Sequence, residues 1–342
     1  MIVHHERPRN CETPISELVG SLTLQASFYV RNHFDAPTLD AANWRLEVGG
    51  LVEHPLRLRL ADLEGMRSQT LIVTLECAGN GRAFLHPATE GEPWGLGAVG
   101  TAAWTGVSLG DVIDRAGPGA PVRELVFRGA DSGPVGQSSE IRGFERSLPI
   151  DEARQSGAVL AYAMNGEPLP RQHGYPLRLI VPGWYGVASV KWLTTIEAIK
   201  TPFSGYFQTE KYVYEWERGG PVVREPVNRL RVRALITEPG PDQAVDAGDL
   251  VVRGMAWSGA APIARVEVRV GGGAWREARL LGSPSRDRWQ PWVLIASVAD
   301  PGRTTVAARA TDLAGRTQPK RPEWNRLGYG SNAIQEVAIH VR

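Results

Sequence analysis

The segment Thr74–Arg82 reads T-L-E-C-A-G-N-G-R and continues an apolar run, Leu71–Leu75, that is rich in β-branched residues. Such a run predicts a buried strand, and the small residues after it predict a loop. The two glycines permit positive φ angles and let the backbone approach a large ligand. Arg82 places a cation a few residues beyond the one thiol, Cys77, which favours the thiolate and attracts anions. The segment therefore predicts a strand that delivers a reactive thiol to a ligand-binding loop.

This string resembles the segment (T/L)-x-C-A-G-N-x-R of the sulfite oxidase family of molybdenum enzymes. In that family the Cys is the one protein ligand to molybdenum, and the dithiolene of a pyranopterin, molybdopterin, supplies further ligands. The resemblance implies that Cys77 is the metal ligand and that the cofactor is molybdenum-molybdopterin. A soft thiolate suits such a metal. One thiol without a second Cys or His at ligand spacing, however, is not a metal site built by protein alone, and a lone Cys is often only structural.

The bulk properties are those of an ordinary globular protein. A length of 342 residues suggests two domains. The formal net charge of +1 gives no basic field for nucleic acid. No apolar stretch approaches the roughly 20 residues that a membrane-spanning helix needs. We therefore expect neither a nucleic-acid partner nor insertion into a membrane.

The two cysteines, Cys11 and Cys77, give no disulfide framework and fit a reducing compartment. We interpret Cys11 as incidental. The sequence MIVHHERPRN at the start lacks the apolar run of a secretory signal. The expected location is cytoplasmic, or periplasmic if a leader has been removed.

Phe28–His33, F-Y-V-R-N-H, is aromatic and β-branched and predicts a strand that ends in a cation and an imidazole. By itself Arg31 would be a solvated residue at the end of a strand. The family segment F-x-x-R-N-H, which this stretch resembles, supplies an Arg that binds the substrate oxyanion and a His that contacts the pterin. The resemblance implies these roles for Arg31 and His33.

Three further motifs resemble family segments that bind the pterin cofactor. The longest, Met164–Arg178, matches M-N-G-x-P-L-P-x-x-H-G-x-P-x-R, whose His and Arg bind the pterin phosphate. A buried phosphate requires charge-assisted donors, so a His and an Arg make physical sense there. The other two are a G-x-D and the motif S/H-V-K-W-L. The implied cofactor-binding residues are Asp131, His173, Arg178, Ser189 and Lys191, in addition to His33 and Cys77.

The family also implies a substrate pocket. Its W-x-x-G-A stretch places Trp94 at the wall of that pocket, and Arg82 joins Arg31 in binding the anion. Tyr212 falls where the family keeps a Tyr that faces the metal, although Tyr206 and Tyr214 lie close in the sequence. We therefore expect the catalytic residues to be Arg31, Arg82 and Tyr212.

After Pro226-Val227-Asn228 the pattern changes to short alternating strands every 8–12 residues, separated by Gly or Pro turns. This pattern predicts a β-sandwich. The family has an immunoglobulin-like domain here, through which two chains dimerise. The expected fold class is α+β, mostly β, with a molybdopterin-binding catalytic domain over 1–227 and an immunoglobulin-like dimerisation domain over 228–342.

The resemblance implies oxidation of sulfite to sulfate, with electrons passed to an external acceptor, a cytochrome or dioxygen. The chain has no C-x-x-C-H motif and no visible haem domain, so we expect no haem in it. One departure matters: the family's W-N-x-R-G is W-N-R-L-G here, with Leu327 at the Arg position. The alternatives are a nitrate reductase, a sulfoxide reductase on the same cofactor, and a non-catalytic β-rich binding protein.

Overall fold

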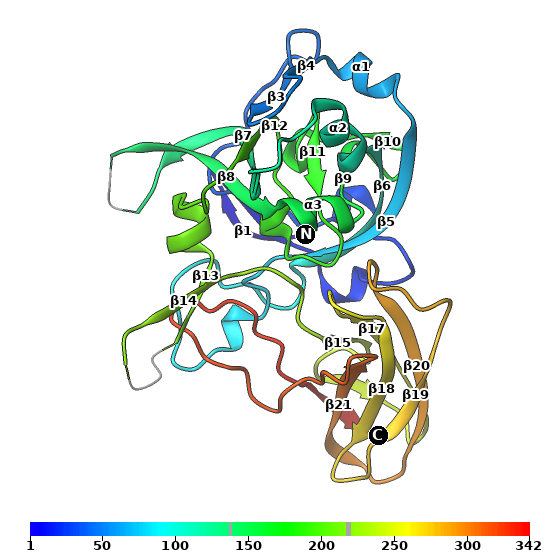
Figure 1. The fold of residues 1–342 in the computed structure, drawn as a ribbon. Coiled ribbons are helices and arrows are strands. Elements are labelled where there is room, and N and C mark those ends of the chain that lie inside the picture. Colours follow the sequence, from blue (N-terminus) through cyan, green and yellow to red (C-terminus); the bar gives the residue numbers. More distant parts are fainter. Residues whose placement is uncertain (137–138, 217–219) are drawn as a thin grey trace.

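The computed structural model describes residues 1–136, 139–216 and 220–342. It consists mostly of β-strands, as predicted, with short helices between them. Figure 1 shows two bodies of β structure, a larger one formed by the N-terminal part of the chain and a smaller one formed by the C-terminal part. None of the helices in the described ranges has the length and apolar character that crossing a bilayer requires.

The N-terminal arm forms a small hairpin followed by two turns of 3-10 helix. Strands β1 (Ile2–Glu6) and β2 (Arg9–Glu12) pair antiparallel, and η1 (Ile15–Glu17) and η2 (Gln25–Ser27) follow. The predicted strand at 28–33 is wrong, because this stretch makes only one isolated bridge, at Val30. The carbonyls at its end accept hydrogen bonds from side chains instead of from a neighbouring strand.

A five-stranded sheet carries the Thr74–Arg82 segment. Its strand order is β10-β9-β6-β5. On the same side of β9 as β10, strand β11 pairs with the first residues of β9, from Val159 to Ala161. The predicted buried strand is confirmed as the second half of β5, whose last residue is Glu76. The members of this sheet are β5 (Ser68–Glu76), β6 (Val99–Ser108), β9 (Val159–Met164), β10 (Glu167–Pro168) and β11 (Arg178–Ile180).

A second five-stranded sheet has the order β4-β3-β12-β7-β8. Strands β3 and β12 are parallel, and the other neighbours are antiparallel. Asp131 lies on its longest strand, β7. The strands are β3 (Leu46–Gly50), β4 (Leu56–Leu58), β7 (Glu124–Pro134), β8 (Ile141–Pro149) and β12 (Leu193–Ile199).

Three short α-helices pack with these sheets: α1 (Leu60–Glu64), α2 (Leu109–Ala116) and α3 (Ile150–Gln155). Helix α2 begins where the Ser108 hydroxyl accepts a hydrogen bond from the Asp111 amide, and it ends at Gly117, whose φ is 65°. Its buried face joins apolar side chains of both sheets in one core, for example Leu46, Phe127, Leu160 and Leu193.

The hairpin β13 (Val213–Trp216) and β14 (Val223–Pro226) leads into the C-terminal β-sandwich. Its strand order is β15-β17-β20-β19-β18-β21-β22-β16, with β19 pairing to both β18 and β20 and so linking the two halves. The short strands that the alternating pattern predicts after residue 228 are confirmed. The strands are β15 (Arg233–Glu238), β16 (Gln243–Val245), β17 (Gly248–Trp257), β18 (Ile263–Val270), β19 (Arg276–Leu280), β20 (Gln290–Val298), β21 (Gly302–Asp312) and β22 (Gln335–Val341).

Candidate active site

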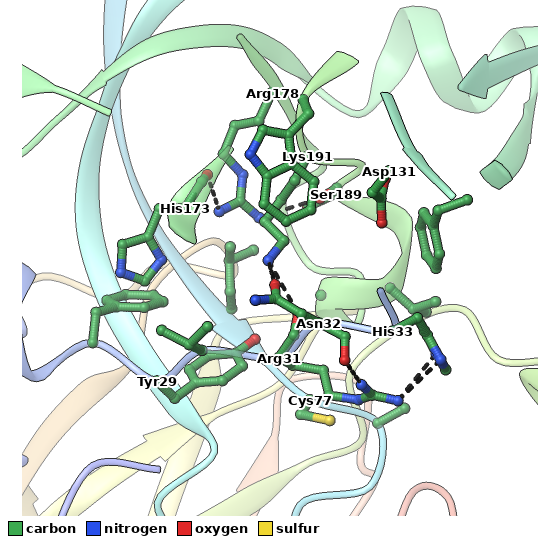
Figure 2. Close-up of a pocket in the computed structure, with 18 of the residues that line it drawn as sticks. Tyr29, Arg31, Asn32, His33, Cys77, Asp131, His173, Arg178, Ser189 and Lys191 are labelled. Carbon is green, nitrogen blue, oxygen red and sulfur yellow. Dashed lines mark hydrogen bonds between the residues drawn. The ribbon is translucent and has the colours of Figure 1, made fainter. Parts of the chain in front are cut away.

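A crevice in the N-terminal domain brings together most of the predicted site residues. Figure 2 shows Cys77 and Arg31 at one end of it and Arg178, Ser189 and Lys191 at the other. The residues that line this crevice come from several segments that are far apart in sequence. The predicted residues in its lining are Arg31, His33, Cys77, Asp131, His173, Arg178, Ser189, Lys191 and Tyr212.

Cys77 is the first residue after β5 and is 6% exposed. Its amide donates to the Ala98 carbonyl at 2.8 Å, and its carbonyl accepts from the Asn80 amide at 2.9 Å, so the loop around it is closed. Burial raises the pKa of the thiol, and the Arg31 and Arg82 cations only partly offset that effect. Arg82 therefore lowers the pKa of the thiol, as expected, but burial raises it by more. A bound metal ion would deprotonate such a thiol outright.

The opposite end of the crevice is cationic. Arg178, on β11, donates to the His173 carbonyl at 3.0 Å and the Ser189 carbonyl at 3.2 Å. His173 ends the 3-10 helix η4 (Arg171–His173), and burial next to Arg178 lowers its pKa to about 3. The Lys191 ammonium donates to the Arg31 and Gln172 carbonyls at 3.1 and 3.0 Å, and its pKa lies well below the usual range because it is buried near Arg178.

Two buried polar atoms of the lining, Asp131 Oδ1 and Arg178 Nε, have no hydrogen-bond partner among the residues that the structure describes. Burial raises the Asp131 pKa to about 6, although Lys191 opposes the shift. Buried polar groups in native proteins are nearly always paired, so an orphan donor and an orphan acceptor in one crevice indicate a ligand with complementary groups. Three cationic residues, Arg31, Arg178 and Lys191, face it with one carboxylate, which favours an anionic ligand. These features fit a pterin that carries a phosphate.

Near Cys77, one cation and two hydrogen-bonding rings lie together. The Tyr212 hydroxyl is 2.7 Å from His33 Nε2, and an Arg31 nitrogen is 3.1 Å from the same imidazole nitrogen. Burial beside Arg31 holds the His33 pKa well below its usual range, so the ring is neutral. Tyr212 directly follows the π-helix η6 (Phe207–Lys211) and is 4% exposed. The arrangement offers one cation and one hydroxyl to a small anion.

Arg82 is not among the described residues that line the crevice, but its charge acts on the nearby Cys77 thiol and on Tyr212. Its place in the substrate pocket stays a prediction. Its Nε and one terminal nitrogen donate to the Leu327 carbonyl at 3.3 and 3.1 Å, and the other donates to the Glu92 carbonyl at 2.9 Å. The guanidinium also lies over the Tyr329 ring, 5.0 Å from its centroid. Through these contacts Arg82 joins the loop that follows Cys77 to the C-terminal domain.

Trp94 is not among the described residues that line the crevice either, and its place at the wall of the substrate pocket stays a prediction. The side chain is 0% exposed and packs edge-on against His4 of the N-terminal arm, at 4.9 Å between ring centroids. Its neighbours in the core include Phe28, Leu75 and Trp104. The arm covers Trp94, and the sequence gives no sign of where that arm folds.

Sequence reasoning missed three residues around the site. Asn32 binds Gln172 at 2.7 Å and also accepts from Lys191, and its place between the motif's Arg and His could have drawn attention to it. Tyr29 lines the crevice and is labelled in Figure 2. Tyr329, from the C-terminal domain, stacks on Tyr212 with 5.0 Å between centroids. For the two tyrosines no sequence signal was available, because their positions depend on the tertiary fold.

Comparison with known families and proteins agrees with this architecture. Residues 33–207 match the oxidoreductase molybdopterin binding domain, and residues 224–342 match the Mo-co oxidoreductase dimerisation domain. Mitochondrial sulfite oxidase of Rattus norvegicus is 34% identical over 99% of this chain, which spans 65% of that protein's length. Sulfite oxidase of Arabidopsis thaliana is 33% identical, covering 99% of this chain and 93% of the relative.

Among solved structures, the sulfane dehydrogenase SoxCD from Paracoccus pantotrophus is similar, with a TM-score of 0.84 and 30% identity. The alignment covers 96% of this chain and 83% of that one. The similarity thus extends over both domains. The chain belongs to the sulfite oxidase family of molybdenum oxidoreductases.

Proposed function

We propose that the protein oxidises sulfite to sulfate in a molybdenum-dependent reaction. The observation that carries this proposal is the grouping of a buried thiol, Cys77, with Arg31 and Tyr212 at one end of a crevice whose other end is cationic. The reaction consumes water and balances as sulfite plus water giving sulfate, two protons and two electrons. The electrons pass to an external acceptor, either a cytochrome or dioxygen.

In this proposal the crevice would hold the cofactor. Cys77 would ligate molybdenum, which requires the thiolate and matches a soft ligand to a thiophilic metal. Arg178, His173 and Lys191 would hold the pterin phosphate, and Arg178 Nε and Asp131 Oδ1, which have no partner among the described residues, would be available to polar groups of the cofactor. Ser189 has a supporting role. Its hydroxyl accepts a hydrogen bond from the Val181 amide at 3.1 Å, which fixes the segment between these two residues. When bound, this group supplies the oxygen-atom transfer and takes up the two electrons.

The chain's own residues then bind and orient the substrate. Arg31 presents a planar cation that matches two oxygens of a small oxyanion. The Tyr212 hydroxyl, hydrogen-bonded to neutral His33, orients a substrate oxygen and stays protonated at neutral pH, because burial raises its pKa. His33 holds that hydroxyl in place. Binding and orientation are therefore the protein's part of the reaction.

The decisive experiment is sulfite-dependent reduction of ferricyanide by protein already shown to contain molybdenum. We expect turnover in the wild type and its loss in Cys77→Ser, with the pterin still bound. Absence of turnover in the molybdenum-loaded wild type would contradict sulfite as the substrate. Unchanged turnover in Cys77→Ser would contradict the assigned metal ligand.

A second candidate substrate is reduced sulfur of the sulfane type. Two observations favour it: the overall similarity to the sulfane dehydrogenase SoxCD, and Leu327, an apolar and 5% exposed residue where the family's sulfite-binding pattern has an Arg. One cation fewer at the pocket weakens attraction for a dianion. Loaded protein that leaves sulfite unchanged should therefore be tested with sulfane-sulfur compounds, and then with nitrate and sulfoxides.

The chain carries a dimerisation domain, and we propose that it forms a homodimer through residues 228–342. The domain boundary after residue 227, the immunoglobulin-like character of the sandwich, the cytoplasmic location and the absence of haem stay predictions. Sedimentation of the purified protein tests the homodimer. A monomer at micromolar concentration would contradict it.

A further inference from the structure

Glu76 is the last residue of β5 and directly precedes Cys77. Successive side chains of a strand point to opposite faces, so the carboxylate points away from the thiol. Its position is the unspecified one in the family's Cys motif, and the crevice lining does not include it. Glu76 is nevertheless only 1% exposed. A carboxylate this deeply buried requires partners.

The partners of Glu76 come mainly from the other domain. The Trp257 indole donates to Oε2 at 2.9 Å, and Arg233 Nε lies 3.4 Å from Oε1. Trp257 and Arg233 are direct cross-strand partners on β17 and β15, and both are almost fully buried. The C-terminal sandwich therefore presents one hydrogen-bond donor, the Trp257 indole, and one cation, Arg233, to the end of β5.

The same carboxylate also holds the loop that carries the thiol. Asn80 Nδ2 donates to Glu76 Oε1 at 2.9 Å, while Asn80 Oδ1 accepts from the Ala98 amide at 3.1 Å. The Ala98 carbonyl in turn accepts from the Cys77 amide at 2.8 Å. Arg233 adds a hydrogen bond to the Asn80 carbonyl at 3.3 Å. Each end of the short turn from Cys77 to Asn80 is thus connected to Glu76 or to its partners.

We propose that Glu76 is a positioning residue for Cys77, through which the C-terminal domain fixes the direction of the thiol toward the crevice. This inference rests on the proposed role of Cys77 as metal ligand. In this inference the dimerisation domain also supports the metal site, because the orientation of the Cys77 thiol depends on Arg233 and Trp257. Groups that orient a metal ligand influence the metal centre as well as the fold.

A purely structural role would make Glu76 only a connection between the domains. The two possibilities differ in what a substitution changes. Loss of a simple connection lowers stability and leaves the metal centre of the folded protein as it was. Loss of a positioning residue changes the overlap between the Cys sulfur and the metal, and this overlap determines the sulfur-to-molybdenum charge-transfer absorption.

The test uses full-length, molybdenum-loaded Glu76→Gln, which keeps the shape of the side chain. We expect full molybdenum content, a shifted charge-transfer band, and kcat lowered about 10-fold with KM little changed, the lower end of the range for such outer residues. Trp257→Phe removes one donor and keeps an aromatic ring, so it should shift the band in the same direction. If Glu76→Gln does not fold, the same measurements on Trp257→Phe test the inference.

The matched control is Glu215→Gln, which removes another ion pair between the domains, that of Glu215 with Arg326 at 2.5 Å. It should leave the band unchanged. An unchanged band and kcat in folded, loaded Glu76→Gln and Trp257→Phe would overturn the inference. The proposed function has its own test. It is contradicted if the molybdenum-loaded wild-type protein lacks a charge-transfer band, or if Cys77→Ser leaves that band in place.

Discussion

At the scale of single residues, Arg31 is the cation whose charge acts most strongly on the Cys77 thiol. Arg82 follows it in this effect and donates its described hydrogen bonds to the carbonyls of Leu327 and Glu92. We predict that Arg31→Met raises the KM for sulfite roughly 10- to 150-fold, from about 1.5–3 kcal/mol for a hydrogen bond to a charged group. Steady-state kinetics with ferricyanide measure this change, and kcat should change less.

Arg154→Gln is a suitable control, because it removes an exposed cation that pairs with Asp114 at 3.2 Å, away from the crevice. Its KM should equal that of the wild type. A KM for Arg31→Met within twofold of the wild type would contradict the assignment of Arg31 to substrate binding. An equal rise in both variants would indicate only a long-range charge effect.

At the scale of elements, the π-helix η6 positions Tyr212, and Arg146 on β8 holds that element in place. Arg146 is 1% exposed and donates to the Phe207 carbonyl at the start of η6 and to the Val227 carbonyl at 3.0 Å. The Val227 amide donates to the Tyr212 carbonyl at 2.9 Å. Burial lowers the Arg146 pKa to about 10, so the side chain stays charged at neutral pH.

We predict that Arg146→Met lowers the free energy of unfolding by about 2–4 kcal/mol, because two buried carbonyls lose their donor. It should also lower kcat, since Tyr212 is held less firmly. Urea denaturation and steady-state kinetics measure the two effects. Unchanged or increased stability would mean that the cost of burying the cation exceeds the value of its hydrogen bonds.

The elements show why some predictions succeeded. The apolar run before Cys77 and the alternating strands after residue 228 carry their own periodicity, and the structure has strands there. The stretch 28–33 has equally suitable residues but makes one bridge only, because Lys191 and Arg31 occupy its terminal carbonyls. Local pattern predicts a strand only where a neighbouring strand is available to pair with it.

At the scale of the whole molecule, the site combines segments that no local pattern connects. Motif spacing indicated most residues of the crevice, but it gave no sign of the contacts that Arg82 and Trp94 make. The acceptor of Arg82 is a carbonyl 245 positions later in the chain, and the aromatic partner of Trp94 lies in the N-terminal arm. The same applies to Glu76, whose partners Arg233 and Trp257 belong to the other domain. Contacts between segments that are far apart in the chain were the part that the sequence could not supply.

A second ion-paired cluster between the domains makes stability depend on pH. Glu215 on β13 accepts from Arg326 at 2.5 and 3.1 Å and from Arg224 at 3.0 Å. These hydrogen bonds, first that to Arg326, lower the Glu215 pKa below its usual value. Because the folded-state pKa is the lower one, the pairing stabilises the protein above the unfolded-state pKa, about 4.3. The stabilisation disappears as the pH falls through the folded-state value.

We therefore predict that Glu215→Gln lowers the free energy of unfolding by about 1 kcal/mol at pH 7, a modest value because Arg326 is 56% exposed and solvent screens the pair. At pH 3 the difference between variant and wild type should be smaller, and high salt at pH 7 should reduce it as well. Urea denaturation at both pH values measures the difference. A difference that stays constant from pH 7 to pH 3 would mean that Glu215 stabilises the domain contact by packing and not by its charge.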